Sequence, residues 1–121
     1  DAWGRPKYFG EALQDFPDMK LILAHLGQGY KEDMTDLCAR FPNLYTDISG
    51  QFTNLDEPGG RQSDELVEFI RTFGVEKVMW GTNFPMNNPV RYSELTEKLP
   101  LTSEEKELIG NKNARRVIGI N

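Results

Sequence analysis

The feature that most constrains the fold is a repeated unit in which an amphipathic helix is followed by a short apolar strand. A similar pattern closes two of the predicted helices: Phe16-Pro17-Asp18 precedes the apolar run 20–24, and Phe41-Pro42-Asn43 precedes the run 44–47. Proline disfavours helical geometry in the residue before it, so each pattern ends a helix. Strands separated by helices imply right-handed crossovers and a parallel sheet. We therefore expect an α/β fold.

Periodicity predicts three strands, with helices between and after them. The predicted strands are residues 20–24, expected to be buried on both faces, residues 44–47 and residues 75–80. The first predicted helix spans residues 6–16, with an apolar stripe of Phe9, Leu13 and Phe16, and the second carries the stripe Met34, Leu37, Cys38 and Phe41. The third helix runs from an N-cap at Ser63 to a C-cap at Gly74. Three more are predicted after the last strand: residues 92–99, a helix that begins at the capping box 102–105, and a short helix from near Asn111. Segments 48–62 and 81–89 are rich in Gly, Pro, Asn and Asp and are predicted loops.

Length and composition exclude several classes of protein. The 121 residues permit one domain, residues 1–121, and the net charge of −5 argues against a nucleic-acid partner. The longest apolar run, Leu21 to Ala24, is far too short for a membrane span, and the first residues show no signal peptide. Cys38 is the only cysteine, so no intrachain disulfide forms; we expect a buried structural thiol and a reducing, cytoplasmic setting.

Two parallel architectures are compatible with this pattern: a small open sheet covered by helices on both faces, or a piece of a barrel. A self-contained doubly wound domain usually has about five strands, and only three are visible. Three parallel strands leave two exposed edges and a small core. The sequence therefore favours a fragment of a larger α/β fold, with a free-standing domain as the alternative.

Polar residues follow each predicted strand, where parallel α/β folds place their chemistry. The three segments are His25-Leu26-Gly27-Gln28-Gly29, Asp47-Ile48-Ser49-Gly50 and Gly81-Thr82-Asn83-Phe84-Pro85. An imidazole at such a position can ligate a metal or exchange a proton near neutral pH. Composition alone leaves open a histidine that is satisfied by backbone groups.

Four segments in order resemble a known family: Leu-Ile-Leu-Ala-His-Leu-Gly, Phe-Pro-Asn-Leu-Tyr-Thr-Asp-Ile-Ser-Gly, Trp-Gly-Thr-Asn-Phe-Pro and Asn-Lys-Asn-Ala-Arg-Arg-Val-Ile-Gly-Ile. Together they resemble the last three βα units of the amidohydrolase-related family, which includes metal-dependent hydrolases and aromatic or muconate-type decarboxylases. The resemblance implies that the chain is the C-terminal portion, about strands six to eight, of a (β/α)8 TIM barrel. A whole barrel needs about 250 residues, so the N-terminal part is expected to be missing.

The resemblance also implies roles for the residues at the strand ends. It places His25 at the strand-six histidine, which lines the site and handles substrate or water. A His-x-His pair and one further histidine, the family's metal ligands, would lie in the missing part, because this chain has one histidine. Asn83 stands where the family commonly has the aspartate that binds the metal and takes a proton from water. An amide ligates a hard cation weakly and is no base.

Asn83 leaves three explanations open: a natural variant with weaker ligation, a relic in an inactive homologue, or an engineered knock-out. Asp47 is expected to orient its neighbours by hydrogen bonding with Ser49 and the loop, with a catalytic role as the alternative. Trp80 and Phe84 are candidates for a substrate pocket, with core packing as the alternative.

Arg61 is a candidate for binding a substrate carboxylate, as is Arg91, with a solvated surface position as the alternative for both. Asn113, Ala114 and Arg115 resemble the family's closing helix and are expected to be structural.

The expected function of the whole protein is that of a metal-dependent hydrolase. It would act on a small cyclic ester or amide through water activated by a divalent metal, with Zn2+ as the expected ion. The alternatives are a non-oxidative decarboxylase on the same scaffold and a non-catalytic barrel fragment. The isolated chain is expected to be inactive. Its partners would be the small-molecule substrate and, at the open strand edges, the missing half of the barrel or another copy of the chain.

Overall fold

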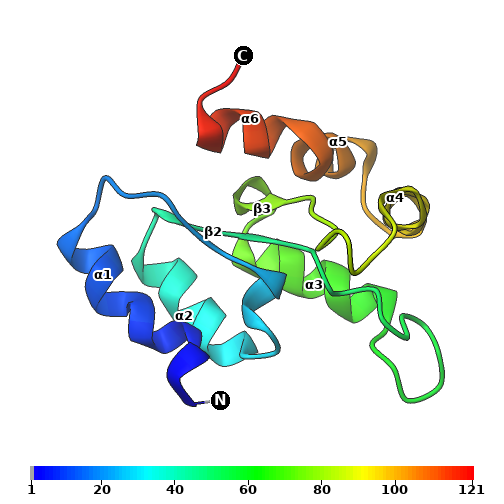
Figure 1. The fold of residues 1–121 in the computed structure, drawn as a ribbon, viewed down its shortest axis with the longest axis horizontal. Helices are drawn as coiled ribbons and strands as arrows, with labels where there is room; N and C mark the ends of the chain where they lie inside the picture. The colour runs from blue at the N-terminus through cyan, green and yellow to red at the C-terminus, as the bar shows by residue number, and fades with distance from the viewer. Residues whose placement is uncertain (1) are drawn as a thin grey trace.

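Three parallel strands form the centre of the computed structural model, which describes residues 2–121 (Figure 1). The strands are β1 (Leu21–Leu23), β2 (Leu44–Asp47) and β3 (Val78–Met79), and they lie in the order β1-β2-β3. Leu21 is opposite Leu44, and Thr46 is opposite Val78. The parallel α/β arrangement predicted from the repeat is therefore present.

Helices precede, connect and follow the strands. The helix α1 (Gly10–Asp15) precedes β1 and follows the 3-10 turn Pro6–Phe9. The helices that connect the strands are α2 (Lys31–Arg40) and α3 (Ser63–Phe73). The C-terminal helices are α4 (Pro89–Lys98), α5 (Ser103–Glu107) and α6 (Asn113–Ile118), the last two joined by the π turn Leu108–Lys112. Further 3-10 turns span Ala2–Gly4, His25–Gly27 and Val75–Lys77. In Figure 1, α1 to α3 lie along one side of the sheet, and α5 and α6 lie on the other side near β3.

The hydrophobic core lies between the sheet and the helices of the first side. Leu44 and Val78 in the strands are fully buried, as are Leu37 of α2 and Leu66 and Ile70 of α3. These helix residues belong to the stripes that the sequence predicts, because apolar side chains at helical spacing share one face. None of the helices within residues 2–121 has the length and apolar character that a bilayer span requires.

The first strand is not buried on both faces, so that prediction was wrong. Leu21 and Leu23 pack against the core, whereas Ile22 between them is 43% exposed. Successive side chains of a strand point to opposite faces, and β1 is an edge strand of the described sheet. A strand made only of apolar residues, such as β1, does not by itself show that other elements cover both faces of the sheet.

Some predicted boundaries differ from the structure. The third strand is shorter than expected, since Val75–Lys77 is a 3-10 turn closed by the Lys77 N–H on the Gly74 carbonyl at 2.9 Å. The N-cap of α3 is Gln62 rather than Ser63, whose hydroxyl donates to Asp56. The stripe of the first helix does not extend to Phe16, which is 61% exposed.

The C-terminal helices form one continuous run rather than the two separate helices predicted. The capping box between Thr102 and Glu105 is present as expected. The π turn at 108–112 then carries the chain directly into α6. The Ile109 carbonyl accepts from the Trp80 N–H at 2.8 Å, so the turn is hydrogen-bonded to the chain directly after β3.

Asn113 has the structural character that the sequence predicts, whereas Cys38 is less buried than expected. Asn113 is fully buried, and its side-chain amide donates to the carbonyls of Val75 and Val78 at 2.7 and 2.8 Å. Cys38 is half-buried and its thiol contacts the Thr35 carbonyl; burial raises the pKa of the thiol above its usual range.

Candidate functional site

His25, Asp47 and Ser49 meet at the carboxyl ends of β1 and β2, and we call these three residues the strand-end network. The backbone N–H of His25 donates to Asp47 Oδ1 at 3.1 Å. The Ser49 N–H donates to the same oxygen at 2.9 Å, and the Ser49 hydroxyl donates to it as well. The hydrogen bond that the sequence predicts between Asp47 and Ser49 is therefore present.

The imidazole of His25 is fixed through one of its two nitrogens. Its Nδ1 lies 3.0 Å from the Ser49 carbonyl oxygen and 2.7 Å from Ser49 Oγ. A carbonyl only accepts, and the hydroxyl proton is already donated to Asp47, so Nδ1 carries the hydrogen in both contacts. Nε2 is then the basic nitrogen of the neutral ring. It forms no hydrogen bond to any residue between 2 and 121.

The backbone at His25 adopts an unusual left-handed turn. His25, Leu26 and Gln28 have φ values of 61°, 48° and 55°. This conformation costs a residue other than glycine about 1–2 kcal/mol. Burial of Leu26, which is 1% exposed, opposes that cost. A Cβ at Gly27 would lie 2.7 Å from Met34 Sδ, so only glycine fits there. The packing around the turn therefore holds His25 in place.

Close backbone approaches bring the other strand ends to the network. At Gly50, with φ of 70°, a Cβ would lie 3.2 Å from His25 Nδ1. At Gly81, just after β3, a Cβ would lie 3.5 Å from the Asp47 Cγ. Glycine at position 50 lets the loop after β2 pack directly on the network, whereas at position 81 a Cβ would make only an ordinary van der Waals contact.

Two residues that sequence reasoning missed support the network: Gln51, from the loop after β2, and Tyr92, from α4. Gln51 Nε2 donates to the His25 carbonyl at 2.8 Å, and its Oε1 accepts from Arg61. The Tyr92 hydroxyl accepts from the Gln51 N–H at 2.9 Å and donates to the Ile48 carbonyl at 3.2 Å. Burial raises the pKa of Tyr92 above its usual range, so the phenol keeps its proton.

No sequence signal identified Gln51, because it lies in an irregular loop without periodicity. For Tyr92 a signal was present but ambiguous. It lies on the buried side of α4, and a tyrosine at a core position needs a partner for its hydroxyl. The sequence alone does not name that partner.

Asn83, Phe84 and Trp80 are not hydrogen-bonded to the strand-end network. The side chain of Asn83 is exposed, its φ is 61°, and its backbone carbonyl accepts from the Met86 N–H at 2.9 Å. Phe84 is 73% exposed. The Trp80 indole donates to Thr96 Oγ1 at 3.1 Å, which links the chain after β3 to α4. The functional roles expected for these residues remain predictions.

The two candidate arginines differ in their surroundings. Arg61 is joined to the network through Gln51. Arg91 lies on the exposed side of α4 and pairs with Glu94 at 3.2 Å. The alternative of a solvated surface position therefore describes Arg91 better than Arg61.

The described residues do not fit a metal ion by themselves. Within residues 2–121, no group of three or more His, Cys, Asp or Glu side chains is close enough to hold one. His25 and Asp47 are near each other, but Ser49 already occupies the Nδ1 of His25 and one oxygen of Asp47. A metal site would need ligands from outside these residues.

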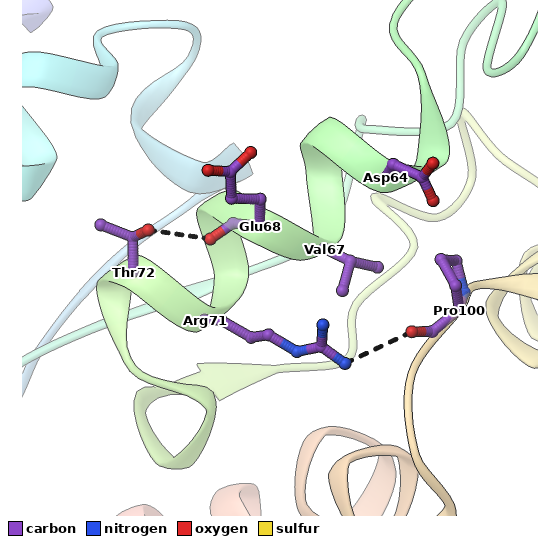
Figure 2. A pocket seen from close by; sticks show the side chains of 6 residues that line it. All are labelled: Asp64, Val67, Glu68, Arg71, Thr72 and Pro100. Atoms are coloured by element: carbon purple, nitrogen blue, oxygen red, sulfur yellow. Dashed lines mark hydrogen bonds between the residues drawn. The ribbon is translucent and has the colours of Figure 1, made fainter.

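A surface hollow of about 450 Å³ lies away from the network, on the outer side of α3 (Figure 2). Its lining residues are Asp64, Val67, Glu68, Arg71, Thr72 and Pro100. Figure 2 shows Arg71 reaching across it to the Pro100 carbonyl. None of the strand-end residues lines this hollow, so we base the candidate site on the network.

Comparison with known proteins extends the picture. A family model described as Amidohydrolase matches residues 3–120. The chain is 21% identical over 116 residues to a gamma-resorcylate decarboxylase of Rhizobium sp. strain MTP-10005, covering 87% of this chain and 36% of that protein.

Two solved structures share the fold. An uncharacterized TIM-barrel protein of Bordetella bronchiseptica has a TM-score of 0.77 at 24% identity, covering 94% of this chain and 39% of its own. The dihydroxybenzoic acid decarboxylase of Polaromonas sp. JS666, solved with manganese and 2-nitroresorcinol, has a TM-score of 0.71 at 18% identity. The match covers 91% of this chain and 36% of the decarboxylase. The chain thus spans well under half the length of these proteins, and its fold corresponds to part of a TIM barrel.

Proposed function

The chain belongs to the amidohydrolase family, and from that premise we propose that the whole protein is a non-oxidative decarboxylase of a hydroxylated aromatic acid. The names of the gamma-resorcylate decarboxylases among its relatives support this reaction. The observation that carries the proposal is the imidazole of His25, whose Nδ1 is fixed by Ser49 while Nε2 has no partner within residues 2–121.

The reaction requires one proton at carbon. Loss of CO2 breaks a carbon–carbon bond and leaves its electron pair on the ring carbon, which must then be protonated. A protonated His25 would deliver that proton from Nε2. The carboxylate of Asp47, acting through the Ser49 hydroxyl, would hold the imidazole in its orientation during the transfer. The imidazole of His25 would regain a proton from solvent after the product leaves.

Hydrolysis, the function expected first from the sequence, is the second candidate because the matching family model is described as an amidohydrolase. It fits the residues less well. A hydrolase must remove a proton from the attacking water, and the Asn83 amide cannot accept one. Decarboxylation does not depend on a base at that position.

We also propose that the whole protein binds a divalent metal, as the manganese-containing neighbour does. The ion would be manganese or zinc. Residues beyond those described would supply most of its ligands, and Asn83 would supply at most a weak one.

A substrate comparison tests the proposed function. The full-length protein would be supplied with Mn2+ or Zn2+ and with 2,6-dihydroxybenzoate, and release of CO2 and resorcinol would be measured. We expect turnover in the wild type and a loss of about 100-fold in kcat for His25→Gln, in line with the usual contribution of a general acid. Arg91→Gln serves as the control and should leave turnover unchanged. Opening of cyclic esters or amides without any CO2 release would overturn the proposal in favour of the hydrolase.

A further inference from the structure

We propose that Arg61 binds a second carboxylate of the substrate, one that is retained in the product, and that Gln51 is the positioning residue that sets Arg61 relative to His25. This inference rests on the proposed decarboxylase function. It narrows the preferred substrates to aromatic acids with two carboxylates, so that an acid with one carboxylate, such as 2,6-dihydroxybenzoate, would be turned over with a higher KM.

The side chain of Gln51 bridges Arg61 and His25 with both of its polar atoms. Nε2 donates to the His25 carbonyl at 2.8 Å and approaches the Ser49 carbonyl at 3.4 Å. Oε1 accepts from Arg61 Nη1. A guanidinium only donates and a carbonyl only accepts, so the amide has one possible orientation. The bridge fixes the arginine head group relative to the backbone of His25.

The loop that carries Arg61 is itself held in a defined shape. The Asp56 N–H donates to the Arg61 carbonyl at 2.8 Å, and the Asp56 carboxylate accepts from the Ser63 N–H at 2.7 Å, at the start of α3. A Cβ at Gly60 would collide with the Asn54 carbonyl, so the turn before Arg61 requires glycine. Arg61 is therefore presented by an ordered loop and not by a free one.

Arg61 is a cation without a carboxylate partner in the described part of the chain. Arg5, Arg40, Arg71 and Arg91 each form an ion pair with an acidic side chain. Arg61, like Arg115 and Arg116, contacts only uncharged groups among the described residues, but it differs from those two in being joined to the strand-end network through Gln51. A guanidinium has five N–H donors and binds a carboxylate with two of them. With one nitrogen committed to Gln51, donors remain for an anionic group.

The departing carboxylate is a poor partner for this arginine. CO2 is neutral, so the charge on that group disappears as the bond breaks. A guanidinium bound to it would stabilise the substrate more than the transition state and would slow the reaction. A carboxylate that keeps its charge throughout is held equally well in both states. Arg61 thus suits a second carboxylate, and its contribution belongs in KM.

Equilibrium binding to the full-length protein tests the inference independently of turnover. The probes are isophthalate, with two carboxylates, and benzoate, with one. A charge-assisted bidentate contact is worth about a tenfold difference in affinity or more. We expect wild type to bind isophthalate at least about tenfold more tightly than benzoate. Arg61→Gln should lose that preference, and Arg61→Lys should keep only part of it.

Variants at Gln51 separate positioning from charge. Gln51→Glu should abolish the preference, because a carboxylate at position 51 would pair with Arg61 and neutralise it. Gln51→Ala should reduce the preference without removing it, since Arg61 keeps its charge but loses its position. Arg91→Gln is the matched control and should behave as wild type.

The outcomes distinguish the inference from the proposed function. Absence of an isophthalate preference in wild type, or its persistence in Arg61→Gln, would overturn the inference whether or not the protein releases CO2. A wild type that shows the preference and releases no CO2 from any aromatic acid would overturn the proposed function and leave Arg61 as a carboxylate-binding residue. With a turned-over substrate, Arg61→Gln should raise KM and leave kcat within about twofold.

Discussion

His25 is held by its backbone N–H, its carbonyl and its ring Nδ1, and the ring contact decides which tautomer is present. Both partners of Nδ1 belong to Ser49, and its carbonyl oxygen can only accept. We therefore predict that the neutral ring carries its proton on Nδ1. Long-range 15N–1H NMR of the 121-residue chain would show this without ambiguity, because the chain has one histidine. The urea-unfolded chain is the control and should revert to the Nε2–H form that free histidine prefers; the same form in the folded chain would contradict the prediction.

Asn83 lends itself to a direct test of the expected metal chemistry. We predict that Asn83→Asp in the full-length protein raises metal-dependent turnover by about tenfold or more, because it supplies a charged metal ligand in place of a weak one. The left-handed φ of 61° presents no obstacle, since aspartate tolerates this conformation nearly as well as asparagine. Steady-state kinetics at several metal concentrations would measure the change. Asn83→Ala is the control, and equal rates for all three proteins would remove position 83 from the chemical centre.

At the scale of elements, the attachment of α6 to β3 depends on one side chain. Asn113 is fully buried and donates to the carbonyls of Val75 and Val78. We predict that Asn113→Ala lowers the free energy of unfolding by about 3 kcal/mol, because a buried carbonyl and a half-buried one lose their partner. Urea denaturation would measure this loss. Asn111→Ala, at an exposed position on the same helical run, should cost about 0.5 kcal/mol or less; similar losses for both variants would contradict the assigned role.

The contact between α3 and α5 predicts a dependence of stability on pH. Arg71 donates to both oxygens of Glu105 at 2.8 Å, and this contact, with the Thr102 N–H, lowers the pKa of Glu105 from 4.5 to about 2. A folded pKa below the unfolded value stabilises the fold above the unfolded pKa, and the stabilisation is lost as pH falls from about 4.5 to about 2. Because Arg71 is half exposed, we expect a loss of about 1 kcal/mol.

Chemical denaturation of wild type and Glu105→Gln across that pH range checks the expectation. The glutamine variant should be less stable near pH 6, and the two proteins should converge as pH approaches 2. Glu104→Gln, a neighbouring exposed position on α5, is the control and should follow wild type. A constant difference between wild type and Glu105→Gln at every pH would show that the charge is not responsible.

The elements also show which parts of a fold local sequence specifies. The helix stripes, the capping box and the proline-terminated helices depend on residues a few positions apart, and the structure contains them. The Val75–Lys77 turn and the π turn depend on contacts with distant segments, and the spacing of apolar residues along the chain does not predict such contacts. The pairing of Ser49 with His25 was within reach because both follow strands. The bridge from Gln51 to Arg61 was not, since it depends on the shape of a loop.

For the molecule as a whole, the open edge and face of β1 predict how the chain behaves alone. Ile22 is 43% exposed beside Tyr45 on β2, and β1 has no second neighbour in the sheet of the described residues. We predict that the isolated 121-residue chain self-associates through this edge, and that Ile22→Lys shifts it toward monomer. Analytical ultracentrifugation over a range of concentrations would measure the shift. Phe84→Lys, at an exposed apolar position after β3, is the control; a monomeric wild type would contradict the prediction.

The π turn at 108–112 has a consequence for how this chain tolerates the loss of a residue. Such a turn holds one residue more than an α-helical turn, so deleting Gly110, which is exposed, would let the run from α5 to α6 become a regular helix. Local helical geometry would improve. Because the π turn accommodates its extra residue within one turn, the residues after the deletion would keep nearly the same orientation around the helix axis. Asn113 would therefore still face the carbonyls of Val75 and Val78, so this run of helix should tolerate the loss of one residue at the turn where a regular helix would not.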